Sequence, residues 1–324
     1  MQRRTLLAAA ALLGATLSPV AWAQAWPTQP VKIIVPTGPG SSLDLIVRLM
    51  SNQLAARWGQ PVLIDNKPGA GGLLGIDLAA KAGDGHTLAI GFNGPLAYAP
   101  YLYAKVPYDP ARDLKAIVMT TSQANVLAVN AEKVPAKTVA EFVAWAKAQG
   151  GKLNYSSLGQ GSSAHLTMEL FLAEAGLQAV HVPFNGSPPA AMAVAQGTAD
   201  ATFMVAPALL PHVQSGKVRL LAVSANARPD SLKALPSLAE AGYPKVESLA
   251  WNGLVGPASM PDSTVARINA DVNELLAKDA PLRDAMAKSG LTIVGGSAAE
   301  FRRFIDADVA RWGPVITKLG VKLN

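Results

Sequence analysis

Residues 31–66, VKIIVPTGPGSSLDLIVRLMSNQLAARWGQPVLIDN, decide the fold. They begin with VKIIVP, a short apolar run rich in β-branched residues, which predicts a buried strand. A turn of small residues follows, and the apolar spacing from Leu45 to Leu54 then predicts a helix that ends at Gly59. Because PVLIDN predicts a second strand, the stretch reads as one strand-helix-strand unit with a parallel crossover.

The same alternation continues through the chain and restarts after residue 124. GLLGIDLAAKAG predicts a helix and HTLAIGF a strand, and the later units run from ANVLAVN to VRLLAVS. We therefore expect an α/β fold of two domains, each a mostly parallel sheet flanked by helices. The carboxyl ends of parallel strands form the usual ligand crevice, so the ligand cleft should lie between the domains.

The expected division of the chain places the C-terminal tail with the first half. Residues 24–124 together with 248–324 are predicted to form domain 1, and residues 125–247 domain 2. The hinge strands should then lie near 124–129 and 246–252.

The first 23 residues have the pattern of a secretory signal. Arg3 and Arg4 form a basic head, an apolar run extends to about Leu17, and AWA ends at Ala23. The apolar run is short of the ~20 residues that a membrane span needs. We expect export to the periplasm with cleavage after Ala23, and the sequence leaves the Sec and twin-arginine routes open.

Composition excludes several classes of protein. Only 15% of residues are charged, the net charge is +6, and no run of five or more Lys and Arg occurs, so nucleic-acid binding is not expected. There is no cysteine and there are four scattered histidines, which argues against a disulfide framework and a metal site.

Motifs for a cofactor or a catalytic centre are incomplete. GQGSSA, residues 159–164, matches GxGxxA between a strand and a helix, yet no acidic residue ends the following strand AVHVPF. No cofactor is therefore predicted. No GxSxG is present, and His165 stands too close to the serines at a helix start to act as their base. We predict that the protein is not an enzyme.

Four polar turns follow predicted strands, at residues 37–42, 92–94, 159–163 and 184–188. Each offers backbone N–H groups with hydroxyl or amide donors, and none contains Lys or Arg. A helix N-terminus favours an anion by roughly 0.3 to 1 kcal/mol, and up to ~2 when partly buried. Two such turns that face each other could hold a carboxylate.

Several longer segments resemble one known family. PVKIIVPTGPGSSLDLIVRLM, DNKPGAGG, LNYSSLGQGSSAHLTMELF, HVPFNGSPPA and WNGLVGPASMP occur in order over nearly the whole mature chain. Together they resemble the Bug family, the extracytoplasmic solute receptors of tripartite tricarboxylate transporters. The resemblance implies a periplasmic binding protein, here expected to be monomeric, whose domains close on a small organic acid and present it to membrane permease subunits.

The resemblance also implies which residues contact the ligand. In this family a loop of each domain binds ligand carboxylates, often through ordered waters. Carried over to this chain, the ligand-binding residues are Thr37, Gly38, Gly40, Ser41, Ser42, Asn93, Ser162, Ser163, Asn185, Gly186 and Asp200. Asp200 could serve a ligand amine or merely cap a turn.

The first loop departs from the family pattern. The usual PFPPGG is replaced by residues 36–41, PTGPGS, so an aromatic wall is lost at Thr37 and hydroxyls are gained. This difference predicts a more polar or differently shaped ligand, and Tyr98, Tyr101 or Trp251 could supply an aromatic side chain instead.

Two other functions stay open at this stage. An exported enzyme acting on a carboxylate would need His165 or Asp200 as its catalytic group. A sensor that reports ligand occupancy to a membrane kinase would use the same cleft. The sequence does not choose the ligand.

Overall fold

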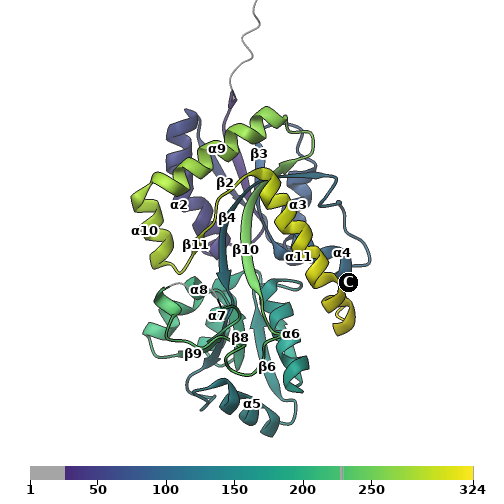
Figure 1. The fold of residues 1–324 in the computed structure, drawn as a ribbon, viewed down its shortest axis with the longest axis vertical. Coiled ribbons are helices and arrows are strands. Elements are labelled where there is room, and N and C mark those ends of the chain that lie inside the picture. Colours follow the sequence, from purple (N-terminus) through teal and green to yellow (C-terminus); the bar gives the residue numbers. More distant parts are fainter. Residues whose placement is uncertain (1–25, 227, 229, 324) are drawn as a thin grey trace, which may run out of the picture.

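The computed structural model describes residues 26–226, 228 and 230–323, and Figure 1 shows their arrangement. The predicted signal and its cleavage position lie outside these residues. Two sheets lie one beyond the other along the long axis of the molecule, and each has its own helices. We call the body around the first sheet lobe 1 and the body around the second sheet lobe 2.

Lobe 1 contains a six-stranded sheet with the order β11-β4-β10-β3-β1-β2. Its strands are β1 (Val31–Val35), β2 (Val62–Asn66), β3 (Thr87–Phe92), β4 (Leu114–Ala124), β10 (Leu249–Pro257) and β11 (Thr292–Ile293). Its helices are α2 (Ser42–Trp58), η1 (Ala70–Gly72), α3 (Leu73–Ala80), η2 (Gly94–Tyr98), α4 (Ala99–Leu102), α9 (Asp262–Lys278), α10 (Ala280–Lys288) and α11 (Ala298–Leu319).

Lobe 2 contains a five-stranded sheet with the order β7-β6-β8-β5-β9. Its strands are β5 (Val126–Asn130), β6 (Leu153–Ser157), β7 (Ala179–Pro183), β8 (Ala201–Met204) and β9 (Val218–Val223). Its helices are α5 (Val139–Ala148), α6 (Ser163–Ala175), α7 (Ser187–Ala195), α8 (Ala206–Gln214) and the short η3 (Asp230–Leu232).

The pairing of the strands is mixed, which corrects the expectation of mostly parallel sheets. β1 pairs in parallel with β2 and β3, and β6 with β7 and β8. β10, however, is antiparallel to β3 and β4, and β5 is antiparallel to β8 and β9. The antiparallel strands β5 and β10 both start where the chain crosses between the lobes. The strands β1, β3, β6 and β8 run the other way and end near this crossing.

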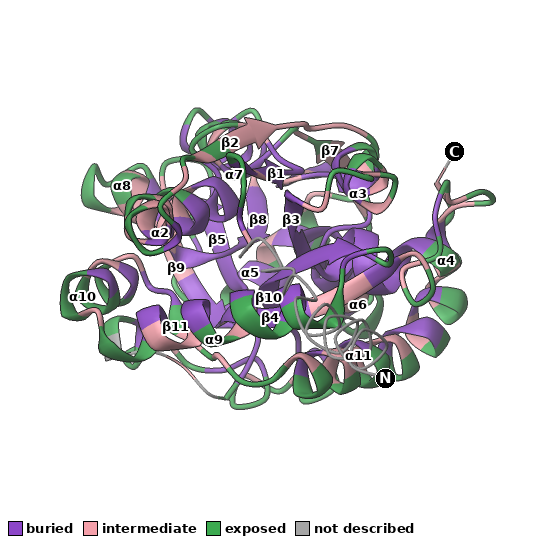
Figure 2. Ribbon diagram, turned by 90° about the horizontal axis from the view of Figure 1, so that it is seen from above, coloured by how far each residue is buried: buried purple, intermediate pink, exposed green. Residues whose placement is uncertain are grey.

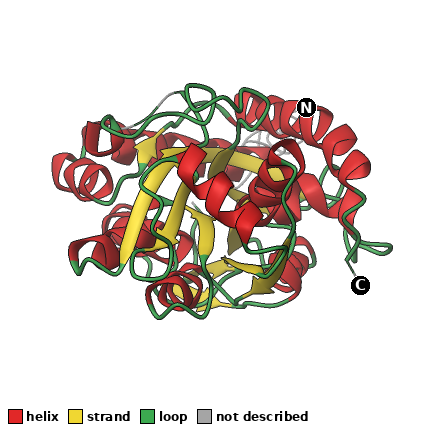
Figure 3. Ribbon diagram, turned by 90° about the horizontal axis from the view of Figure 1, so that it is seen from below, coloured by secondary structure: helices red, strands yellow, loops and turns green. Residues whose placement is uncertain are grey.

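Both faces of each sheet are buried. Along β1, Ile33 packs in one core cluster and Ile34 in the other, and along β5, Leu127 and Val126 are divided in the same way. Successive side chains of a strand point to opposite faces, so these runs must be apolar throughout. Figure 2 shows the buried strands inside and the exposed residues on the outer helix faces, and Figure 3 shows the helices surrounding the strands.

The chain crosses between lobes at Asn125 and near Ser248. Asn125 follows β4 and precedes β5, and its side-chain amide donates to Ser248 Oγ at 3.2 Å. Its backbone N–H donates to Ser224 Oγ, and Ser224 Oγ donates to the Ser248 carbonyl at 2.7 Å. All three residues are buried, so the two crossing segments are tied to each other and to the end of β9.

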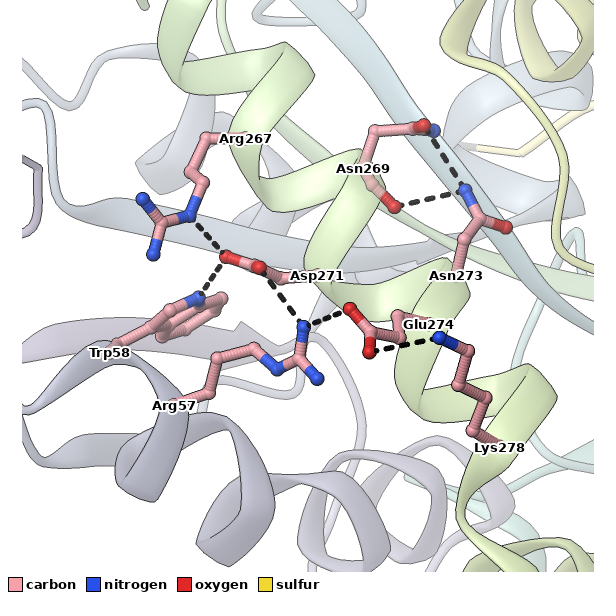
Figure 4. A network of polar contacts seen from close by, with 8 residues as sticks. All are labelled: Arg57, Trp58, Arg267, Asn269, Asp271, Asn273, Glu274 and Lys278. Carbon is pink, nitrogen blue, oxygen red and sulfur yellow. Dashed lines mark hydrogen bonds and ion pairs between the residues drawn. The ribbon is translucent and has the colours of Figure 1, made fainter.

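After the second crossing, α9 returns to lobe 1 and packs on α2. Figure 4 shows Asp271 of α9 between the two helices. Its carboxylate accepts from Trp58 Nε1 at 2.9 Å, from Arg57 at 3.3 Å and from Arg267 at 2.7 Å. The C-terminal segment is thereby held to lobe 1. No helix of the described residues is long and apolar enough to cross a membrane.

Candidate functional site

A narrow pocket lies between the lobes. Its volume is about 20 Å³, close to the room that one water molecule needs. From lobe 1 it is lined by Pro36, Thr37, Pro68, Gly69, Gly71, Gly72 and Phe92, and from lobe 2 by Leu158, Gly159, Ser162, Phe184 and Asn185. None of these lining residues carries a charge, so an ion bound here would meet backbone dipoles and neutral side chains.

The pocket lies where four strands end. Residues 36–37 follow β1, Phe92 ends β3, residues 158–159 follow β6, and residues 184–185 follow β7. This is the carboxyl edge at which open α/β sheets bind ligands. A wider surface groove of about 650 Å³ is formed by α9, α10 and residues 291–295. That groove belongs to lobe 1 alone and lies near β11, at the other edge of the sheet from β1 and β2.

The first-lobe loop, residues 37–42, is held by its own side chains. Ser41 is the N-cap of α2 and accepts from Asp44 N–H, while its hydroxyl is hydrogen-bonded to Thr37 Oγ1 at 2.6 Å. Gly40 N–H donates to Asp44 Oδ2 at 2.8 Å. Gly40 itself has a φ of +75°, a left-handed conformation that suits glycine.

Asp44 is a buried carboxylate behind this loop. Burial pushes its pKa up, but hydrogen bonds from Arg48, Gly40 and Asn66 outweigh that effect and lower the pKa below the usual value. The ionised carboxylate therefore fixes the loop and uses the Gly40 N–H itself. The Gly40 N–H is therefore already engaged, and the Ser41 hydroxyl takes part in hydrogen bonds within the loop.

The second-lobe loop, residues 158–163, has the same design. Ser162 is the N-cap of α6; its hydroxyl accepts from His165 N–H and donates to the Gly159 carbonyl at 2.7 Å. The His165 imidazole accepts from Gly161 N–H at 3.1 Å through Nδ1. Ser162 and His165 therefore do not form a nucleophile and base pair.

The two loops meet across the cleft. Gly38 N–H donates to the Asn185 carbonyl at 3.3 Å, and a Cβ on Gly38 would lie 2.8 Å from that oxygen. A Cβ on Gly186 would lie 3.5 Å from Gly38 N. The lobes are thus in contact at the predicted residues Gly38, Asn185 and Gly186.

Two predicted serines keep uncommitted hydroxyls. Ser42 and Ser163 are the first residues of α2 and α6, and they are 5% and 3% exposed. Within the described part of the chain, neither hydroxyl has a hydrogen-bond partner. The first backbone N–H groups of each helix also lack intrahelical partners. Neither serine lines the pocket itself, but each lobe has free donors directly after its pocket-lining loop, since Ser42 lies beyond Thr37 and Ser163 follows Ser162.

Asn93 and Asp200 lie outside the pocket. The Asn93 amide donates to Asp308 Oδ2 at 3.1 Å and to Tyr98 OH at 2.9 Å, and Asn93 Oδ1 accepts from Trp251 N–H. Asp200 stands before β8, where its Oδ2 accepts from Asn154 N–H at 2.9 Å. This hydrogen bond lies at the amino end of β6, away from the pocket. Asp200 therefore caps a turn there, which was one of the two roles considered for it.

The aromatic walls come from residues that the sequence analysis did not propose. Phe92 and Phe184 line the pocket, one from each lobe. Tyr98 and Trp251 are fully buried in the core of lobe 1, and Tyr101 packs against Gly313 of α11. None of these three residues lines the pocket, so they pack in lobe 1 and do not take the place of the lost phenylalanine.

The segment 68–72 also lines the pocket without having been predicted, through Pro68, Gly69, Gly71 and Gly72. Gly69, Ala70, Gly71 and Gly72 all have positive φ, at 147°, 46°, 63° and 96°. Such a run brings the backbone close to the other lobe, because a Cβ on Gly71 would collide with the Gln160 carbonyl. The glycine density of this segment was the signal that could have revealed it.

The comparisons with known proteins agree with this geometry. Residues 46–321 match the family described as tripartite tricarboxylate transporter family receptor. Protein BugT of Bordetella pertussis is 33% identical over 304 residues, which cover 93% of both chains.

The chain belongs to the tripartite tricarboxylate transporter receptor family, which includes the Bug proteins. Receptors of this family are periplasmic solute-binding proteins.

Two solved structures of similar proteins hold acids. An R. palustris protein with adipate is 32% identical, with a TM-score of 0.88 over 92% of this chain and 100% of that one. A Rhodopseudomonas palustris protein with bound malate is 28% identical, with a TM-score of 0.85 over 90% of this chain and 100% of that one. The fold of this receptor is therefore that of a two-domain periplasmic binding protein.

Proposed function

We propose that this receptor captures a small organic acid in the interlobe pocket and presents it to the membrane permease subunits of a tripartite tricarboxylate transporter. The observation that carries the proposal is the pair of helix N-termini, α2 and α6, whose serines Ser42 and Ser163 have free hydroxyls and follow the loops that line an uncharged pocket. Bound adipate and malate in the two similar structures support the ligand class.

The donors can stabilise one carboxylate without a lysine or arginine. A hydrogen bond to a charged group contributes roughly 1.5 to 3 kcal/mol. A partly buried helix N-terminus adds up to ~2 kcal/mol. Because the donors come from both lobes, one acid can use all of them only when the lobes are closed.

Entry of the acid requires the lobes to part. The pocket of about 20 Å³ is too small for a chain of several carbon atoms, so it must widen to hold the acid as well as to admit it. We propose that residues 24–124 with 248–324 and residues 125–247 move as two domains about the crossings at Asn125 and Ser248. The acid then favours the closed state through its greater affinity for that state.

A thermal-shift screen of the mature chain tests this function. Malate, adipate, other mono-, di- and tricarboxylates, amino acids and neutral amides would be compared. Saturation at about 100 times the dissociation constant adds roughly 2.7 kcal/mol, which raises the melting temperature visibly. We expect at least one acid to stabilise the wild type and the exposed-serine control Ser215→Ala equally, and Ser163→Ala much less. Stabilisation by neutral compounds alone would contradict the proposal.

A further inference from the structure

Beneath the second-lobe loop lies a group of titratable side chains that the proposed ligand contacts do not use. His165 of α6 is 4% exposed, and it holds the loop at two points. Its backbone N–H donates to Ser162 Oγ, and its imidazole Nδ1 accepts from Gly161 N–H at 3.1 Å. Because Ser162 lines the pocket, His165 connects the core of lobe 2 to the site.

The hydrogen bond with Gly161 defines the state of the imidazole. A nitrogen that accepts must carry a lone pair, so Nδ1 is unprotonated and the proton of a neutral ring lies on Nε2. Nε2 is 3.8 Å from Glu169 Oε1, one helical turn further along α6. A second proton on Nδ1 would point at Gly161 N–H and break the bond.

A second histidine supports the other end of the loop. His181 of β7 is stacked on His165, with ring centroids 3.9 Å apart and the planes at 8°. His181 Nε2 is 2.7 Å from Ser157 Oγ, and Ser157 Oγ accepts from Gly159 N–H at 3.2 Å. Gly159 and Gly161 are thus both tied to the same pair of rings.

The groups that face His165 are His181 on β7, Tyr155 on β6 and Glu169 on its own helix. Tyr155 stacks on His181 at 4.8 Å and donates its hydroxyl proton to Glu169. Burial lowers the pKa of His165 to about 3, with the neighbouring His181 adding to the shift, and burial lowers the pKa of His181 to about 4. Both rings are neutral near pH 7, as the acceptor role of Nδ1 requires.

We propose that His165 is the positioning residue of the binding site in lobe 2. Its neutral imidazole, protonated on Nε2, fixes Gly161 and thereby the loop that brings Gly159 and Ser162 to the pocket and precedes Ser163. The side chain itself does not touch the ligand. The part of this inference that concerns binding rests on the proposed function, whereas the part that concerns the loop does not.

Nuclear magnetic resonance of the isotope-labelled mature protein tests the loop without a ligand. The proposal predicts a scalar coupling across the hydrogen bond between Gly161 N and His165 Nδ1, with the proton of the ring on Nε2. The coupling should persist at neutral pH and vanish only as His165 becomes protonated. A ring protonated on Nδ1 at neutral pH, or a coupling that is absent, overturns the proposal.

Two substitutions separate positioning from packing. His165→Asn keeps an acceptor near the place of Nδ1, and His165→Leu keeps volume without an acceptor. We expect exchange of the Gly161 amide to be about fivefold to tenfold faster in His165→Leu than in His165→Asn, which corresponds to the loss of one hydrogen bond. Equal exchange in the two variants overturns the proposal. If His165→Leu does not fold, the coupling in the wild type decides.

Affinity for malate or adipate supplies the readout at the site. We expect His165→Leu to weaken binding by about tenfold and His165→Asn by about threefold at most, since the loop is then still held. The wild type should lose affinity as His165 protonates, and His165→Asn should lose less. If no acid binds the wild type, the part of the inference that concerns binding fails together with the proposed function. The scalar coupling still tests the part that concerns the loop.

Discussion

At the scale of the residue, the site separates side chains that shape the loops from side chains that can meet a ligand. Ser41 and Ser162 are N-caps whose hydroxyls are engaged, whereas Ser42 and Ser163 stand one position later with free hydroxyls. Adjacent serines therefore have different roles. Substituting each of the two serines of lobe 2 in turn can therefore separate the stability of the loop from ligand binding.

Ser162→Ala should mainly lower stability, and Ser163→Ala should mainly weaken acid binding. Loss of the N-cap in Ser162→Ala should lower the free energy of unfolding by about 1 kcal/mol. Ser163→Ala should change it by less than about 0.5 kcal/mol, yet weaken acid binding by roughly 1.5 to 3 kcal/mol, the value of a hydrogen bond to a charged group. Denaturant unfolding and calorimetric titration of both variants measure this. Unchanged affinity in Ser163→Ala would contradict the assignment.

The buried histidines predict how stability depends on pH. Their pKa values of about 3 and 4 in the folded state are below the usual 6.5, so the unfolded chain binds more protons between these values. The free energy of unfolding should therefore fall as the pH drops from about 6.5 towards 4. His165→Asn should show a shallower fall in denaturant unfolding from pH 7 to 4. A slope equal to that of the wild type would show that His165 does not titrate as described.

Local caps were predictable from sequence, but distant partners were not. Thr138 directly precedes the helical pattern of residues 139–148, and it is the N-cap that accepts from Glu141 N–H three residues away. Asn93 was expected at the ligand because it follows a strand, but its amide is taken up by Asp308, which is 215 positions further along the chain. Nothing in the turn itself indicates a partner at that distance.

At the scale of the element, the contacts between lobes depend on positions without side chains. Gly38 lies against the Asn185 carbonyl, and Gly94 against the Gly161 carbonyl, where a Cβ would be 3.1 Å away. Loops that end strands in each lobe can approach this closely only if the backbone is bare. Closure of the two lobes should therefore be sensitive to a single methyl group added at one of these glycines.

Gly38→Ala should disfavour the closed state. The new Cβ would be 2.8 Å from the Asn185 carbonyl, and overpacking of this kind costs about 1 to 3 kcal/mol. We expect weaker acid binding and a larger radius of gyration in small-angle scattering with the acid present. Gly83→Ala is the control, because a Cβ there has no neighbour within 4 Å. If Gly38→Ala closes and binds like Gly83→Ala, the described contact does not limit closure.

The order of most helices and strands followed from periodicity, but the direction of two strands did not. β4 was missed, although residues 114–124 pair with β10 along their whole length. A strand at the crossing carries polar side chains such as Thr120, Thr121 and Gln123 in buried positions, so it lacks a continuous apolar run. The reversed β5 and β10 could be placed only after the crossings were known.

At the scale of the molecule, the C-terminal segment belongs to lobe 1. The contacts of α9 with α2 show how it is held. Asp271 accepts hydrogen bonds from Trp58, Arg57 and Arg267 and is 7% exposed. The nearby pair of Lys278 and Glu274 is exposed by comparison.

Asp271→Ala should destabilise the protein far more than Lys278→Ala. Removing the carboxylate leaves the indole N–H of Trp58 buried without a partner, which costs about 1 to 3 kcal/mol, with further loss from the two arginines. Lys278→Ala removes an exposed ion pair and should cost about 0.5 kcal/mol or less. Denaturant unfolding measures both. Similar midpoints for the two variants would contradict the role given to Asp271.

The most direct test of the central claim is a crystal structure with the acid that stabilises the mature chain best. We predict density for the acid between residues 37–42 and 158–163, with one carboxylate within hydrogen-bond distance of Ser42 or Ser163. Density only in the groove between α9 and α10, or none at an acid concentration that saturates stabilisation, would contradict an interlobe site.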